Sequence, residues 1–187
     1  MEKGGFSMDI ETKEWEVLCS EKEIEDRLKI LGSKISEDYK DKKLYVVSLL
    51  KGSFIFTADL VRTLDIPVKV NFMTTSSYGH GQESSGKVKI VSDVQEDLTG
   101  YDVLVTDDIA DSGLTMKSVM EHLKTKNPDS VKCCVLLDKP DRRKVDLAPD
   151  YIGFTIPDKF VVGYGLNFGD YYRNIPYVFA VTERDRK

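Results

Sequence analysis

The feature that most constrains this chain is an alternation of short apolar runs with segments of helical spacing. Apolar runs occupy residues 44–50, 101–106 and 131–137, and helical spacing follows the first two runs at 54–64 and 115–124. Short runs of this kind are typical of strands buried on both faces, and an intervening helix returns the chain for a parallel neighbour. The pattern predicts an α/β fold with a central parallel sheet flanked by helices.

Further elements are predicted on both sides of this core. Ser20 and Glu23 have the spacing of a capping box, and apolar residues at helical spacing follow as far as Tyr39. The remaining predicted strands are weaker and lie at 68–73, 88–91, 160–162 and 177–182.

The length of 187 residues is little more than one domain of about 150 residues. We therefore expect a single domain over residues 1–187, with a core at about 40–148. The chain termini, at about 1–18 and 149–187, are expected to form a small hood.

Composition excludes several classes of protein. The chain is 41% hydrophobic and 32% charged, which is typical of a globular domain, and its net charge of −5 argues against a nucleic-acid partner. No apolar run approaches the roughly 18 residues of a membrane span, and no basic stretch followed by an apolar one opens the chain. We expect a cytoplasmic protein with no membrane partner. Three cysteines cannot all pair, and Cys133 and Cys134 are expected to be small buried thiols.

One segment, residues 74–87, has the composition of a long loop. It contains four serines, three glycines and no aliphatic side chain. Loops of this length inside a compact domain are usually functional or disordered, and in an α/β enzyme we expect a lid.

Three carboxylates follow the apolar run at 101–106, at Asp107, Asp108 and Asp111. In open α/β sheets ligands bind at the carboxyl ends of the strands. The turn at 111–115 (DSGLT) leads into a predicted helix, so its backbone N–H groups and hydroxyls are suited to cradle a phosphate. Carboxylates beside that cradle favour a ligand that also carries sugar hydroxyls or a divalent cation.

These residues resemble a known family. The stretch TDDIADSGLT at 106–115 is similar to the ribose-phosphate signature of type I phosphoribosyltransferases, and its surroundings resemble the hypoxanthine-guanine phosphoribosyltransferases. LKGS at 50–53 resembles that family's pyrophosphate loop, and IPDKFVVGYG at 156–165 resembles the segment that stacks on the base. The resemblance runs from about Leu44 to Arg173 and implies the type I phosphoribosyltransferase fold.

The resemblance also implies an activity and its site residues. The family transfers a phosphoribosyl group from 5-phosphoribosyl 1-pyrophosphate to N9 of hypoxanthine or guanine, with Mg²⁺, in purine salvage. Asp111 would be the general base at purine N7, and Asp107 and Asp108 would hold the ribose and the metal shell. The other implied roles are phosphoribosyl binding by Ser112, Gly113, Leu114 and Thr115, pyrophosphate binding by Lys51, Gly52 and Arg173, purine binding by Lys139, Phe160, Val161 and Asn167, and a lid at Ser77 and Tyr78.

The sequence departs from the family pattern at two relevant positions. Asp107 stands where most members have Glu, and Asn167 stands where the family usually has an Asp that helps to hold a second magnesium ion. An amide is a poorer ligand for a hard cation, so the resemblance does not carry that metal site over.

Two alternatives stay open at this point. One is a regulator that keeps the fold and senses phosphoribosyl pyrophosphate without catalysis, and the other is an enzyme that prefers xanthine. Relatives associate, so the resemblance implies a homodimer or a homotetramer.

Overall fold

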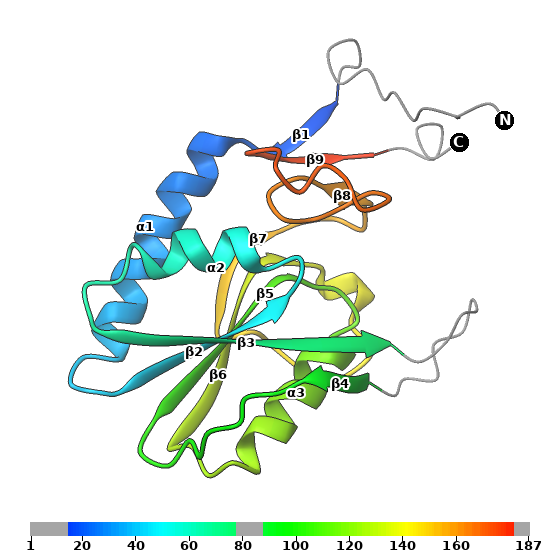
Figure 1. Ribbon diagram of the computed structural model, residues 1–187. Helices are drawn as coiled ribbons and strands as arrows, with labels where there is room; N and C mark the ends of the chain where they lie inside the picture. The colour runs from blue at the N-terminus through cyan, green and yellow to red at the C-terminus, as the bar shows by residue number, and fades with distance from the viewer. Residues whose placement is uncertain (1–14, 78–87, 182–187) are drawn as a thin grey trace, which may run out of the picture.

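The computed structural model describes residues 15–77 and 88–181 (Figure 1). Its helices are α1 (Glu21–Asp38), α2 (Phe54–Val61) and α3 (Leu114–Lys124), with a short 3-10 turn at Pro140–Arg142. Its strands are β1 (Glu16–Cys19), β2 (Leu44–Leu50), β3 (Val68–Ser77), β4 (Val88–Ser92), β5 (Asp102–Ala110), β6 (Ser130–Asp138), β7 (Tyr151–Thr155), β8 (Val161–Val162) and β9 (Val178–Ala180).

The central sheet has six strands in the order β4-β3-β2-β5-β6-β7. All neighbouring pairs are parallel except β3 with β4, which is antiparallel. Helices α1 and α2 cover one face of this sheet and α3 covers the other (Figure 1). Each face carries its own buried apolar cluster, so the predicted α/β fold with a parallel sheet is confirmed.

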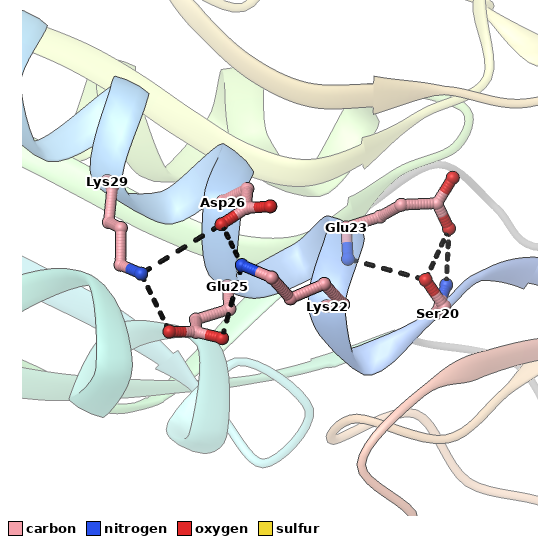
Figure 2. Close-up of polar contacts among 6 residues, drawn as sticks. All are labelled: Ser20, Lys22, Glu23, Glu25, Asp26 and Lys29. Atoms are coloured by element: carbon pink, nitrogen blue, oxygen red, sulfur yellow. Dashed lines mark hydrogen bonds and ion pairs between the residues drawn. The ribbon is translucent and has the colours of Figure 1, made fainter.

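Helix α1 begins where the sequence predicts. The Ser20 hydroxyl accepts from the Glu23 N–H at 3.3 Å, and the Glu23 carboxylate accepts from the Ser20 N–H at 2.8 Å (Figure 2). Exposed ion pairs follow on the outer face, with Lys22 2.5 Å from Asp26. Exposed pairs of this kind contribute little to stability, so the buried inner face of α1 fixes the position of the helix.

A second, three-stranded sheet lies beside α1 and α2, in the order β1-β9-β8 with antiparallel pairs (Figure 1). It joins the first and last described parts of the chain, since Glu16 pairs with Ala180. The expected hood contains these strands. The expected boundary near residue 149 falls just before β7, which pairs with β6 in the central sheet.

The structure corrects three local expectations. Residues 74–77, expected in a loop, continue β3 and pair with β4, as in Ser76 with Lys89. Strand β5 continues beyond residue 106 to Ala110, because β6 pairs with it as far as Asp138. Strands β1 and β7 were not predicted.

The other expectations concern the cysteines and membrane spans. Cys133 and Cys134 are free and buried, as expected, and Cys19 is free and buried as well. Burial raises the pKa of the Cys133 thiol to about 11. Within the described ranges, no helix has the length and apolar character that crossing a membrane requires.

Candidate active site

The candidate site lies where β2, β5 and β6 end. The chain leaves β2 through Lys51, Gly52 and Ser53, here called the β2 turn, and enters α2. It leaves β5 through Asp111, Ser112 and Gly113, here called the β5 turn, and enters α3. Because β2 and β5 are parallel neighbours, both turns lie at the same edge of the sheet.

Asp107 and Asp108 lie between the two turns, in the last part of β5. Both are half-buried, and the Asp108 N–H donates to Asp107 Oδ1 at 3.0 Å. Burial, together with the neighbouring Asp108 carboxylate, raises the pKa of Asp107 well above its usual range. Burial also raises the pKa of Asp108, and the Arg173 guanidinium opposes that rise. The pair is therefore a site that a cation would stabilise.

The β2 turn lies in close contact with this pair and with the segment after β8. A Cβ atom added to Gly52 would lie 1.7 Å from Asp108 Oδ2, and one added to Gly165 would lie 2.1 Å from the Gly52 carbonyl oxygen. Arg173 Nη1 donates to the Gly165 carbonyl at 2.5 Å, and the Gly165 N–H donates to the Arg173 carbonyl at 2.9 Å. Gly52, Asp108 and Arg173, three predicted site residues, are thus brought together. The peptide bond between Leu50 and Lys51 is cis.

The β5 turn is held by residues that follow the 3-10 turn. Gly113 has φ +79°, a conformation that favours glycine, and immediately precedes α3. Arg143 Nη1 donates to the Asp111 carbonyl at 3.2 Å, and the Lys144 N–H donates to the Ser112 carbonyl at 2.9 Å. Arg143 also forms an ion pair with the buried Asp138 at the end of β6. The turn therefore presents the start of α3 at the sheet edge, as the phosphate cradle requires.

The Asp111 side chain is linked to the segment that precedes β8. It accepts from Arg142 Nε at 3.1 Å, and Arg142 Nη1 lies 3.5 Å from Asp158 Oδ2. All three side chains are between 43% and 51% exposed, so substrate could reach the Asp111 carboxylate.

Lys139 is one of the few buried charged residues, with 6% of its surface exposed. Its ammonium donates to the Lys159 carbonyl at 2.5 Å and lies 3.7 Å from Asp158 Oδ1. Its side chain therefore reaches the residue before Phe160. Phe160 is 36% exposed, and its ring packs edge-on against that of Phe168 at 6.0 Å between centroids.

The other predicted residues have the following places. Val161 is buried in β8, and Asn167 is half-buried between β8 and β9. Leu114 and Thr115 begin α3, Ser77 ends β3, and Tyr78 lies outside the described residues.

Several residues that shape the site are not among those predicted from the sequence. Arg142, Arg143 and Asp158 touch predicted site residues, and Gly165 supports the β2 turn. The basic run at 139–144 (KPDRRK) is a signal for the two arginines. No sequence signal identifies Gly165 as the partner of Gly52, because that contact depends on the tertiary fold.

No cluster of three or more His, Cys, Asp or Glu side chains suited to a metal occurs among the residues that the structure describes. Magnesium does not need one, because it commonly uses one or two carboxylates, its own waters and substrate phosphates. Asp107 and Asp108, two adjacent carboxylates whose pKa values burial raises, fit such a partial ligand set.

A cavity of about 660 Å³ lies elsewhere, between α1 and α2, with Tyr164 in its wall. None of the predicted site residues lines it. The candidate site is therefore the polar edge of the central sheet rather than this cavity.

Fold and site together define a transferase of the phosphoribosyl type. Residues 14–169 match the family model described as "Phosphoribosyl transferase domain", and the chain belongs to that family.

Curated relatives cover almost the whole chain. It is 49% identical over 176 residues to a hypoxanthine-guanine phosphoribosyltransferase of Aquifex aeolicus, with 94% of this chain and 99% of the relative covered. It is 48% identical over 172 residues to the hypoxanthine phosphoribosyltransferase of Escherichia coli, with 91% and 97% covered.

Solved structures agree. A hypoxanthine-guanine phosphoribosyltransferase of Bacillus anthracis superposes with a TM-score of 0.86 at 43% identity, covering 90% of this chain and 100% of that one. A Trypanosoma cruzi hypoxanthine phosphoribosyltransferase, solved as a ternary substrates complex of a point mutant, has a TM-score of 0.86 at 38% identity, covering 91% and 97%.

Proposed function

We propose that this enzyme transfers the 5-phosphoribosyl group of 5-phosphoribosyl 1-pyrophosphate to N9 of hypoxanthine and guanine, forming the nucleotide and pyrophosphate in purine salvage. One observation carries the proposal: the β2 turn, the Asp107–Asp108 pair and the β5 turn meet at one sheet edge, with buried Lys139 at the end of the next strand. The names of relatives that share almost half of the sequence support it.

In this proposal the sugar phosphate lies across the ends of β2 and β5. The start of α3, with Ser112, Gly113, Leu114 and Thr115, holds the 5′-phosphate through N–H groups and hydroxyls. Asp107 and Asp108 accept from the ribose hydroxyls. Lys51, the Gly52 amide and Arg173 bind the pyrophosphate, which leaves with its negative charge neutralised.

The purine lies between Asp111 and the segment before β8. Asp111 takes the N7 proton as the bond to N9 forms. Lys139 donates to the 6-oxo group, which adenine lacks, and Phe160 stacks on the ring. Backbone groups of Val161 and Asn167 form hydrogen bonds with the Watson–Crick edge of the base.

Mg²⁺ is the proposed cofactor, and Asp107 and Asp108 would hold it together with the ligand's oxygens. When bound, the ion neutralises charge on the pyrophosphate group. Burial raises the pKa of both carboxylates, and a cation beside them would favour their ionised forms, which supports this assignment.

We also infer three properties of the whole molecule. The segment with Ser77 and Tyr78 closes over the site as a lid and excludes water. The chain assembles as a homodimer or homotetramer, which is supported by exposed apolar side chains on α2 and β3, at Phe54, Val70 and Phe72. Three free thiols fit a cytoplasmic location, and we propose no membrane partner. The net charge of −5 supports a protein without a nucleic-acid partner.

A steady-state assay tests the function. The protein is given magnesium, phosphoribosyl pyrophosphate and, in turn, hypoxanthine, guanine, xanthine and adenine. We expect turnover with hypoxanthine and guanine. Turnover mainly with xanthine would replace the proposed specificity, and tight binding of phosphoribosyl pyrophosphate without turnover on any base would replace catalysis by a sensing role. Sedimentation of the same sample measures the oligomeric state.

A further inference from the structure

A chain of four buried hydroxyls runs beneath the β2 turn. Thr106 Oγ1 lies 2.7 Å from Thr57 Oγ1, Thr57 Oγ1 lies 2.9 Å from Ser48 Oγ, and Ser48 Oγ lies 2.7 Å from Ser53 Oγ. Ser53 Oγ then donates to the Leu49 carbonyl at 2.6 Å. None of the four hydroxyl residues exceeds 2% exposure.

The direction of every proton in this chain follows from its last member. A carbonyl only accepts, so the Ser53 proton is used on Leu49 and Ser48 must donate to Ser53. Ser48 has then used its proton, so Thr57 donates to Ser48. By the same step Thr106 donates to Thr57, and its contact with the Val47 carbonyl at 3.5 Å is the weaker alternative.

The hydroxyl chain lies where β2 and β5 stop pairing with each other. Pairing of β2 with β5 ends at Ser48 and Thr106, whereas pairing of β2 with β3 continues to Leu50. Beyond Ser48, the backbone of β2 therefore has no partner on the β5 side. The hydroxyls replace that lost connection, from Thr106 on β5, through Thr57 on α2, to the Leu49 carbonyl.

Both ends of the hydroxyl chain lie next to residues of the proposed site. Thr106 immediately precedes Asp107, and Leu49 lies two residues before Lys51. We propose that Thr57 is a positioning residue for phosphoribosyl transfer, which through Ser48 and Ser53 holds the pyrophosphate-binding β2 turn in register with the carboxylates of β5. This inference rests on the proposed function for its substrate and on the hydrogen bonds for its geometry.

The test compares three variants. Thr57→Val keeps the shape of the side chain and removes the hydroxyl, and Thr57→Ser restores the hydroxyl. Thr63→Val is the matched control, because Thr63 lies just beyond α2 and donates to the Leu60 carbonyl at 2.7 Å, remote from the hydroxyl chain. The readouts are KM for phosphoribosyl pyrophosphate, KM for hypoxanthine, and the calorimetric Kd of magnesium pyrophosphate.

We expect Thr57→Val to raise KM for phosphoribosyl pyrophosphate and the Kd of magnesium pyrophosphate about tenfold, since misplacement by a fraction of an ångström weakens several contacts together. KM for hypoxanthine should stay within about twofold, and Thr57→Ser should resemble the parent protein. If Thr57→Val behaves like Thr63→Val, or if Thr57→Ser fails to restore binding, the positioning role is wrong.

A readout that does not depend on turnover separates this inference from the proposed function. Amide hydrogen exchange in a peptide spanning residues 49–56 should be faster in Thr57→Val than in Thr63→Val. If the parent protein shows no turnover, the proposed function fails, and this exchange comparison decides the inference alone. Equal exchange in the two variants would overturn it.

Discussion

The two turns beside the carboxylate pair are held in different ways. The β2 turn has uncharged support, with buried hydroxyls beneath it and the backbone of Gly165 against its carbonyl. The β5 turn has charged support, because Arg143 holds the Asp111 carbonyl and Arg142 holds the Asp111 carboxylate. Salt screens exposed charges strongly and leaves buried neutral hydrogen bonds unchanged. Salt should therefore weaken the half-exposed pair of Arg142 with Asp111 at the β5 turn and leave the hydroxyl support of the β2 turn unchanged.

The largest expected effect is a loss of kcat at the β5 turn, which contrasts with a loss of substrate binding at the β2 turn. Asp111→Asn removes the proposed base on the β5 turn and should lower kcat by about 10²–10⁴. Lys51→Met removes a cation from the β2 turn and should raise KM for phosphoribosyl pyrophosphate about 10- to 100-fold. Steady-state kinetics gives kcat and KM for both variants, and Asp141→Asn, at an exposed position, is the control. An unchanged kcat in Asp111→Asn would remove Asp111 from catalysis.

The next effect tests the seat of the β2 turn. Gly165→Ala would place a Cβ 2.1 Å from the Gly52 carbonyl oxygen, at φ +101°. We expect kcat/KM to fall about 10²-fold as the turn is displaced. Gly100→Ala is the matched control, because Gly100 has φ +77° and open space around it. If both variants lose stability equally and keep full activity, contact between Gly165 and the β2 turn is unimportant for function.

A third prediction compares the two arginines of the β5 turn. Arg143→Gln leaves the buried Asp138 carboxylate without its cation, so the free energy of unfolding should fall by about 3–5 kcal/mol. Arg142→Gln breaks pairs that are half exposed, and the loss should be much smaller than for Arg143→Gln. Urea unfolding at low and high salt measures both. Equal losses would show that burial does not distinguish these two supports.

The smallest effect concerns the carboxylates between the turns. The pKa of Asp107 is raised in the folded protein, so as pH rises above 3.8 the unfolded chain ionises first and the folded state loses stability relative to it. Asp107→Asn removes that loss and should raise the Tm at pH 7 in chelator-treated buffer. The difference should disappear below pH 3.8, where both forms are neutral. The exposed Asp129→Asn serves as control, and a lower Tm for Asp107→Asn at pH 7 would contradict the prediction.

Much of the central sheet could be predicted from sequence, and the failures have physical reasons. The runs of β2, β5 and β6 are buried on both faces and therefore almost wholly apolar. Strand β7 has Gly153 at its centre, where a Cβ would lie 2.3 Å from the Leu136 carbonyl oxygen, so its apolar pattern is interrupted. Strand β1 has only four residues and depends on pairing with β9, far away in sequence.

The candidate site shows the same division. The carboxylates and the turn at 111–115 follow directly from a strand, so local pattern places them at the sheet edge. What local pattern could not give is the support from distant segments: Gly165 on Gly52, Arg143 on Asp111, and Thr57 between β2 and β5. Residues 74–77 were wrongly expected in a loop because this polar end of β3 extends past β2 and pairs with β4, so no apolar pattern identifies it as a strand.

The one-way order of the hydroxyl chain restricts how this protein can change during evolution. Loss of the Thr106 hydroxyl leaves every remaining hydroxyl donor with its acceptor. Loss of the Thr57, Ser48 or Ser53 hydroxyl leaves the donor before it without its partner in the chain. Among homologous sequences, we therefore expect the hydroxyl residue to be replaced first at position 106 and last at position 53. The order of these substitutions in a lineage would then follow the direction in which the hydroxyls donate.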